Sequence, residues 1–199
     1  MKIYVLDSLP KRNAEFHADI HLRNGLLSCV KIFSDAVHLL VPNEIRKTER
    51  QYGSGAEKGI SHPVYYYKGQ ELYAPSPVTA PNQWAKWAAG NYMNMWWLVE
   101  SAVQFAQERR IRFDISNQPE YTKMCRWIEE ALTKVFPKKD DARKMDPFPV
   151  TVPLVEGAAV TESSVDICRK YYLTLYGRHR LRWTKRDIPP FVNIPQLRE

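Results

Sequence analysis

The sequence lacks any long hydrophobic run, and that absence argues against a membrane protein. No stretch of the 199 residues approaches the roughly 18 consecutive apolar residues of a membrane-spanning helix. The first residues, MKIYVLDSLPKRN, carry one lysine before only a short apolar run, which is not the pattern of a signal peptide. Cysteine is scarce as well: the three cysteines, at 29, 125 and 168, are widely spaced and form no CxxC motif. We therefore expect no membrane partner, no disulfide framework and a cytoplasmic location.

The motifs of nucleotide-dependent enzymes are also missing. The 8 glycines form neither a P-loop nor a GxGxxG turn, so nucleotide hydrolysis and dinucleotide binding have no support. Nothing around Ser28, Cys29 or Ser34 resembles the strand–turn–helix context of a nucleophile elbow. The sequence therefore predicts no cofactor.

Acidic residues are absent from one segment, and this absence coincides with the chain's excess of positive charge. The net charge is +7, and the window from Arg169 to Arg186 contains 7 basic residues and no Asp or Glu. Tyrosines and Trp183 alternate with these cations. Basic side chains neutralise phosphates and aromatic rings stack on exposed bases, so this pattern favours nucleic acid as a partner. The alternative is a solvated helix face whose aromatic residues point to the core.

The apolar pattern predicts a mainly α fold: a compact single-domain helical bundle, residues 1–199, around a long central helix. That helix is predicted over residues 82–110, which hold four of the 6 tryptophans in two apolar rows. Asn91 is the polar member of one row and would need hydrogen-bond partners there. Gly90 is a candidate kink.

The remaining chain divides into helices and irregular segments. Further helices are predicted over residues 10–40, with Gly25 as a candidate break, and over 117–136 and 162–183. Residues 43–81 are predicted to be an irregular insertion that begins as a polar mobile loop and contains a small β-hairpin turning at Lys68-Gly69-Gln70. Residues 138–160 are predicted to be a proline-rich loop.

The segment HADIH is the first candidate for chemistry. His17 and His21 are four residues apart, so on one helix they would share a face and could hold a metal. No third ligand is visible, and the zincin glutamate is missing, so no metal site is predicted. Two interpretations remain open: structural or DNA-facing histidines, and a catalytic acid–base role for His17, Asp19 or His21.

Four stretches of the chain, in order, resemble a known group of proteins. They are HADIHLRNGLLSCVKIF, WAKWAAGNYMNMWWLVE, MDPFPVTVP and CRKYYLTLYGRHRLRWTKRDIPPF. Together they resemble a group of mostly uncharacterised phage proteins, which are similar to the pyrimidine-dimer DNA glycosylases of the endonuclease V type. The resemblance covers most of the chain but skips residues 43–78.

The resemblance implies a compact all-α protein that binds duplex DNA and acts on damaged or modified pyrimidines. It also implies a DNA glycosylase whose N-terminal amine attacks the sugar C1′ and forms a Schiff base, aided by a carboxylate on the first helix. For a phage protein the location would be the host cytoplasm. The catalytic candidates are His17, Asp19, His21 and Lys2. Trp183 or Trp84 would stack on a base. The DNA-binding candidates are Arg23, Lys86, Lys170, Arg178, Arg180, Arg182, Trp183, Lys185 and Arg186.

Three positions depart from the glycosylase pattern and define the alternative. The chain starts Met1-Lys2 where the family has a processed threonine, Ser28 stands where an acid is expected, and Ala80-Pro81 replaces a His-Pro pair. The alternative is a non-enzymatic module that binds nucleic acid or a host protein and counters a host defence. A metal-dependent nuclease would need a carboxylate cluster. The sequence leaves open whether the protein is an enzyme.

Overall fold

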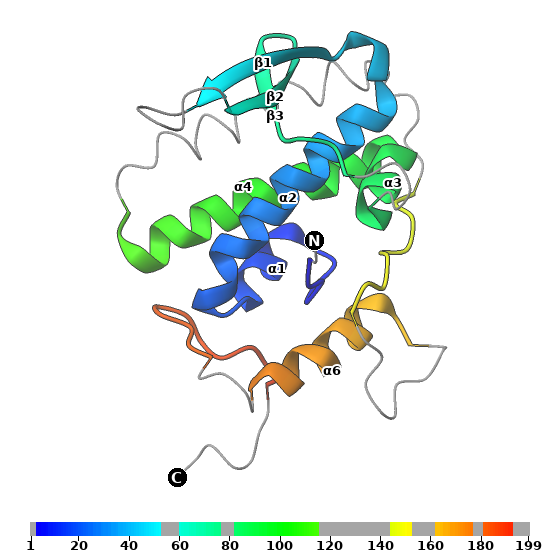
Figure 1. Ribbon diagram of the computed structural model, residues 1–199. Coiled ribbons are helices and arrows are strands. Elements are labelled where there is room, and N and C mark those ends of the chain that lie inside the picture. Colours follow the sequence, from blue (N-terminus) through cyan, green and yellow to red (C-terminus); the bar gives the residue numbers. More distant parts are fainter. Residues whose placement is uncertain are drawn as a thin grey trace.

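The computed structural model describes residues 3–52, 60–76, 82–115, 144–152, 162–176 and 181–192. Within these ranges the protein is mainly α with a small antiparallel sheet, which confirms the predicted class (Figure 1). The helices are α1 Pro10–Phe16, α2 Asp19–Leu40, the short 3-10 helix η1 Pro42–Glu44, α3 Gln83–Gly90, α4 Tyr92–Phe113 and α6 Ser164–Tyr176. The strands are β1 Arg46–Tyr52, β2 Ile60–Tyr67 and β3 Gln70–Leu72. No helix in the described part of the chain is long and apolar enough to span a membrane.

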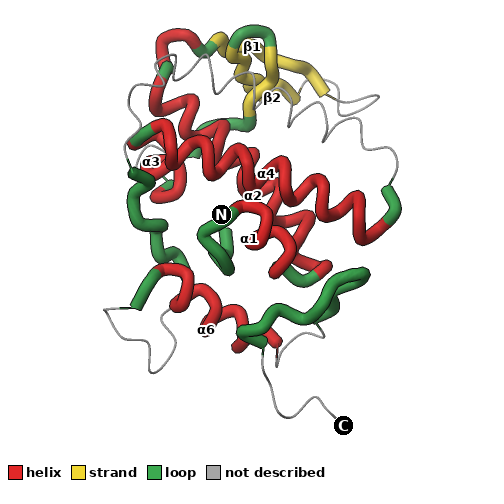
Figure 2. Tube along the Cα trace, turned by 180° about the vertical axis from the view of Figure 1, so that it is seen from behind, coloured by secondary structure: helices red, strands yellow, loops and turns green. Residues whose placement is uncertain are grey.

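Helices α2 and α4 cross in the middle of the fold, between the sheet at one end and α6 at the other. Both views show this order (Figures 1 and 2). The main hydrophobic core takes its residues from α2, α3 and α4, and from single side chains of the sheet such as Tyr67 and Leu72. A second apolar cluster joins Leu6 and Ala18 to α6 and to the segment 181–192.

Gly25 allows α2 and α4 to approach closely. A Cβ atom built on Gly25 would lie 2.8 Å from Cζ of Phe105, closer than side-chain carbons approach in proteins. The candidate break at Gly25 does not occur: α2 runs through this position, and the glycine makes room for the ring of Phe105. The chain instead breaks at His17 and Ala18, whose ψ angles of 135° and 156° are extended.

The predicted long central helix over residues 82–110 is also wrong, because the chain leaves the helix at Asn91. Asn91 has φ −160° and ψ 168°, and its Oδ1 accepts a hydrogen bond from the backbone N–H of Asn94 at 2.9 Å. This is an N-cap, which satisfies an amide at the start of α4 and so separates α4 from α3. The expectation that Asn91 needs partners is confirmed, since its amide nitrogen also donates to Asp146 at 2.9 Å.

A described part of the predicted proline-rich loop, residues 144–152, lies over the tryptophans of α3 and α4. The indole of Trp87 donates to the carbonyl of Asp146 at 3.2 Å, and the ring of Phe148 lies 4.7 Å from that of Trp97. Asn94 donates to the Asp146 carboxylate at 2.8 Å and accepts from its backbone N–H at 2.9 Å. The loop is thus fixed by specific hydrogen bonds as well as by apolar contact.

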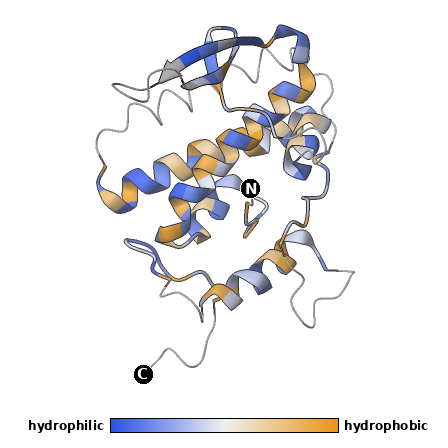
Figure 3. Ribbon diagram, in the orientation of Figure 1, coloured by the Kyte–Doolittle hydropathy of each residue, from blue (hydrophilic) through white to orange (hydrophobic). Residues whose placement is uncertain are grey.

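The insertion contains a three-stranded sheet of order β1-β2-β3, with both pairs antiparallel. The predicted hairpin is confirmed: β2 and β3 join through Lys68 and Gly69, which both have positive φ, 47° and 82°. Positive φ at two successive residues is typical of the tight turns that connect hairpin strands. The predicted mobile loop is wrong for residues 46–52, which form β1. This strand is almost entirely hydrophilic (Figure 3).

Two helix predictions fall partly or wholly on residues outside the described ranges. The helix predicted over 117–136 lies outside them. The helix predicted over 162–183 is described as α6 up to Tyr176, and residues 181–183 are not helical. The prediction was therefore too long, and the chain from Leu181 onward forms a separate stretch, which we call the C-terminal segment (residues 181–192).

Candidate functional site

The HADIH segment lies where the C-terminal segment meets the first two helices. The backbone N–H of Asp19 donates to the carbonyl of Arg182 at 2.8 Å. The indole of Trp183 donates to the carbonyl of Phe16 at 2.9 Å. Two stretches more than 160 residues apart in sequence are thereby held side by side. We call this place the HADIH junction, comprising residues 15–21, 108–114, Tyr172 and 181–186.

Asp19 is the carboxylate at the centre of the junction. It accepts hydrogen bonds from Nη1 of Arg112 at 3.0 Å and from the Thr184 hydroxyl at 2.7 Å, with the Thr184 backbone N–H at 3.2 Å. Its side chain is 14% exposed. The sequence predicted Asp19 as a functional acid but gave no sign of either partner. The carboxylate is fixed in position, and a narrow part of it remains accessible to solvent.

Arg112 is a buried cation that joins α4 to the junction. Its side chain is 0% exposed. Besides Asp19, it donates to the carbonyl of His17 at 2.8 Å, to the carbonyl of Glu15 at 2.6 Å and to Glu108 at 2.6 Å. A buried charge is tolerated when its hydrogen bonds are satisfied in this way. Arg112 therefore orients both the HADIH backbone and the Asp19 carboxylate.

Glu108 connects Arg112 to the C-terminal segment. Its two oxygens accept hydrogen bonds from Nε and Nη2 of Arg186, both at 2.8 Å. Burial raises the pKa of Glu108, but the hydrogen bonds from Arg186 and Arg112 outweigh burial, and the net pKa is lowered. Glu108 thus stays ionised and keeps Arg186 directed inward.

The two histidines of HADIH occupy different environments. His17 lies in the break between α1 and α2 and is buried, with Nδ1 donating to the carbonyl of Asn13 at 2.6 Å. Burial lowers the pKa of His17 to about 3, so its ring is neutral at physiological pH. A sealed, neutral ring is poorly suited to exchange protons with a substrate.

His21 is half-buried and pairs with Tyr172 of α6. The Tyr172 oxygen accepts the backbone N–H of Ala18 at 2.7 Å and lies 2.7 Å from Nδ1 of His21. Because burial raises the pKa of Tyr172, its hydroxyl keeps its proton and is able to donate a hydrogen bond to Nδ1 of His21. Tyr4, also half-buried, packs its ring against His21 with centroids 5.5 Å apart. His21 is therefore the more accessible of the two imidazoles.

Since His17 belongs to the break before α2, the two histidines do not share one helix face, and their Nδ1 atoms have separate partners. No group of three or more His, Cys, Asp or Glu suited to a metal ion occurs among the residues that the structure describes.

Several predicted DNA-binding cations pair with acids from other parts of the chain. Lys185, which has φ 58°, donates to Asp114 at 2.6 Å, Arg186 pairs with Glu108, and Lys170 pairs with Glu162. In the folded protein, these acids therefore compensate part of the positive charge of the segment from Arg169 to Arg186. Arg23, Lys86 and Arg182 are exposed. Arg178, Arg180 and Lys2 lie outside the described ranges.

The two tryptophans predicted to stack on a base have little free ring surface. Trp84 is fully buried, with its indole donating to Thr151 at 3.0 Å. Trp183 is 8% exposed. Base stacking needs an open ring face, so either ring would have to leave its site first.

Sequence reasoning missed Arg112, Glu108 and Thr184. It included Tyr172 among the tyrosines of the basic segment but did not predict its contact with His21. The i, i+4 spacing of Glu108 and Arg112 is a recognisable signal for an ion pair on one helix. Nothing in the sequence marks Thr184 as the partner of Asp19. Comparison of the chain with protein-family models, curated proteins and solved structures gives no match.

Proposed function

We propose that the protein binds DNA at the HADIH junction and acts on damaged or modified pyrimidines as a phage DNA glycosylase-like enzyme. The observation that carries the proposal is the contact between the two ends of the chain that resemble this group. His21 and Asp19 of the first stretch lie against Tyr172 and Thr184 of the last. Catalytic groups are expected to come together in this manner from distant parts of a chain.

The groups at the junction suggest distinct roles. His21, half-buried and bonded to Tyr172, is the candidate for proton transfer. Asp19, oriented by Arg112, is the candidate for stabilising positive charge that develops on a sugar. His17 is better suited to hold the chain break than to act as acid or base.

Exposed cations beside the junction would contact phosphates. Arg182 is bonded to Asp19 through its backbone and leaves its side chain exposed. Arg23 lies one helical turn after Asp19 on α2, and it is exposed as well. Such residues position a protein on the DNA backbone without reading its sequence.

A second candidate function, a non-enzymatic module that binds nucleic acid or a host protein, is favoured by one observation. The Asp19 carboxylate is already occupied by Arg112 and Thr184, which is how a structural acid is held. In that case the junction fastens the C-terminal segment and performs no chemistry.

Borohydride trapping tests the enzyme proposal. The protein is incubated with duplexes that are undamaged, UV-irradiated, abasic or hypermodified at pyrimidines. The expected result is a covalent protein–DNA band on one substrate, in which borohydride reduces the imine formed between the N-terminal amine or Lys2 and the sugar C1′ after the base has left. The band should be lost in His21→Gln and retained in the surface control His62→Gln. No band on any duplex, together with salt-sensitive binding of all of them, would leave the non-enzymatic alternative.

The salt dependence of binding tests the DNA interface separately. Replacing Arg23 and Arg182 by Ala should reduce the slope of log affinity against log salt by about 1.8, if each contacts one phosphate. The matched control removes the same charge from the sheet, with Arg46→Ala and Lys47→Ala, and should leave the slope unchanged. Equal effects of the two double variants would assign the binding to net charge alone.

A further inference from the structure

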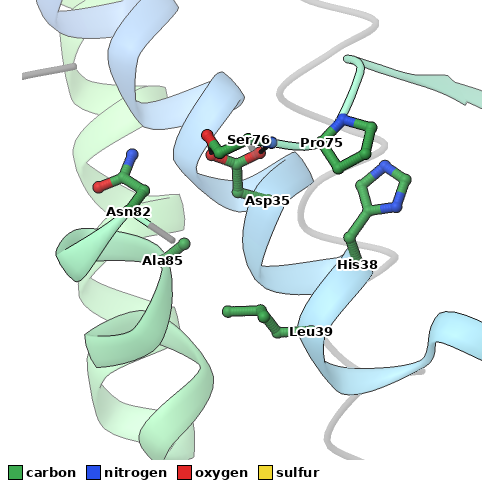
Figure 4. A pocket seen from close by; sticks show the side chains of 7 residues that line it. All are labelled: Asp35, His38, Leu39, Pro75, Ser76, Asn82 and Ala85. Atoms are coloured by element: carbon green, nitrogen blue, oxygen red, sulfur yellow. Dashed lines mark hydrogen bonds between the residues drawn. The ribbon is translucent and has the colours of Figure 1, made fainter. Parts of the chain in front are cut away.

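A cavity of about 290 Å³ lies at the other end of α2, between its last turns, the linker after β3 and the first turn of α3. Figure 4 shows Asn82 and Ala85 on one side, His38 and Pro75 on the other, and Asp35 and Leu39 between them. Asp35 follows Asp19 by sixteen residues on α2, which corresponds to about 24 Å along the helix. The cavity is therefore separate from the HADIH junction.

Asp35 contributes a buried carboxylate without a cation. It is 5% exposed. Its Oδ1 accepts the backbone N–H of Ser76 at 2.9 Å, and its Oδ2 accepts the Ser76 hydroxyl at 2.6 Å. Each oxygen has another lone pair that can accept a hydrogen bond. Within the described ranges no Lys, Arg or His nitrogen lies within 4.0 Å of it.

A lysine is near Asp35 in sequence but is engaged elsewhere. Lys31 precedes Asp35 by one helical turn, yet its ammonium lies 5.4 Å from the centroid of the Tyr73 ring. A cation–π contact with Tyr73 takes the place of an ion pair with the acid. Among the described residues, no cation therefore forms an ion pair with Asp35, and only His38 interacts with its charge at longer range. A buried carboxylate without a paired cation is costly.

His38 lines the cavity beside Pro75 (Figure 4). Its Nε2 donates to the carbonyl of Tyr73 at 3.2 Å, and burial lowers the pKa of the ring. Asn82 uses its Oδ1 to accept the backbone N–H of Trp84 at 3.0 Å and so caps the start of α3.

The rest of the wall is apolar, formed by Leu39, Pro75 and Ala85. From this arrangement we propose that the cavity binds a small organic cation, a primary amine attached to an apolar body. The ammonium group compensates Asp35, and its N–H groups donate to the remaining lone pairs of the two Asp35 oxygens. The apolar body contacts Leu39, Pro75 and Ala85, and its transfer from water stabilises the complex.

NMR titration of the full chain with three matched probes tests this proposal. The probes are 2-phenylethylamine, the neutral 2-phenylethanol and the anionic phenylacetate. The amine is expected to bind at least tenfold more tightly than the alcohol, with shifts confined to residues around the cavity. In Asp35→Asn the amine should lose at least tenfold in affinity and bind no better than the alcohol.

Two further variants keep the test decisive. Leu39→Trp, at an exposed helix position, places a large ring at the cavity and should abolish binding of the amine without removing the acid. Asp166→Asn removes an exposed acid of α6 and should leave amine binding unchanged. Equal affinity for amine and alcohol, preference for phenylacetate, full binding in Asp35→Asn, or no binding of the amine at tens of millimolar would each overturn the proposal.

Discussion

Asp19 and Asp35 lie on the same helix, but the fold treats their charges differently. Asp19 at the start of α2 has a buried arginine and a threonine as partners. Asp35, near the other end, is held by Ser76 alone and borders a cavity. A carboxylate near the start of a helix is also favoured by the helix dipole, which is not true near the end.

The difference separates an acid whose charge is paired within the protein from one that has no paired cation among the described residues. Asp19 pairs with Arg112, Arg112 pairs with Glu108, and Glu108 pairs with Arg186. The charges of these four side chains therefore cancel. At Asp35 the compensating charge must come from outside the described structure. Mutations at the two ends should accordingly have different consequences for stability and for binding.

The largest effect is expected from Arg112→Ala. Removing a fully buried arginine leaves Glu108 and Asp19 short of their partner, which should reduce the free energy of unfolding by about 3–5 kcal/mol. Urea denaturation measures it. The matched control is Arg110→Ala, an exposed arginine of the same helix, which should change stability by less than about 0.5 kcal/mol. A loss under about 1 kcal/mol in Arg112→Ala would contradict a structural role for the network.

The pH dependence of the free energy of unfolding should be dominated by His17, which lies just before the start of α2 at Asp19. The pKa of His17 is about 3 in the folded protein and near the ordinary 6.5 when unfolded, so the unfolded chain binds the proton more readily. The stabilisation is complete above pH 6.5 and is lost as the pH falls toward 3, by up to about 1.4 kcal/mol per unit.

Urea denaturation at a series of pH values compares His17→Gln with His38→Gln. The first should flatten the dependence strongly. The second should flatten it less, because His38 is only about half buried and its pKa is lowered by a less complete loss of solvent. If the free energy of unfolding depended equally on pH in the two variants, His17 and His38 would contribute alike, which would contradict the expected difference between the two histidines.

A smaller effect is expected from Asp19→Asn. The amide keeps an oxygen for one donor but loses the charge that faces Arg112, so we expect a loss of about 1–3 kcal/mol. Thermal unfolding measures the loss. The double variant with Thr184→Val should be less destabilised than the sum of the two single variants, since both remove the same hydrogen bond.

The smallest effect is expected from Asp35→Asn, which should change the free energy of unfolding by less than about 1 kcal/mol. The asparagine oxygen can still accept the Ser76 N–H, and a buried charge without a partner is removed. Thermal unfolding in parallel with Asp19→Asn provides the comparison. A loss as large as that at Asp19 would mean that Asp35 is compensated by a group within the protein.

Local signals predicted much of the fold. The hairpin at Lys68-Gly69 follows from turn residues that tolerate positive φ, and the helical class follows from apolar periodicity. Gly90 was a candidate kink, and α3 ends there, but the full break at Asn91 was not predicted. The apolar periodicity continues across the break, whereas the cap depends on one side-chain hydrogen bond. Strand β1 was missed because its sequence, RKTERQY, lacks alternating apolar residues, and its pairing with β2 supplies the order.

The candidate site was predicted only in part, because its partners come from distant segments. Asp19 and His21 were selected from one short motif, but Arg112, Tyr172 and Thr184 lie 93, 151 and 165 residues away from the groups they contact. The basic segment was interpreted as a free positive charge because its neighbours in the sequence include no acidic residue. In the folded chain its lysines and arginines meet Asp114, Glu108 and Glu162.

The contact between Gly25 and Phe105 offers a criterion for recognising relatives of this chain. A side chain at position 25 is incompatible with a phenyl ring at position 105 when α2 and α4 cross as they do here. Descendants of a common ancestor should therefore exchange the two positions together, with a small residue at 105 wherever 25 gains a methyl group. Such paired substitution would reveal kinship among sequences too divergent for their overall identity to do so.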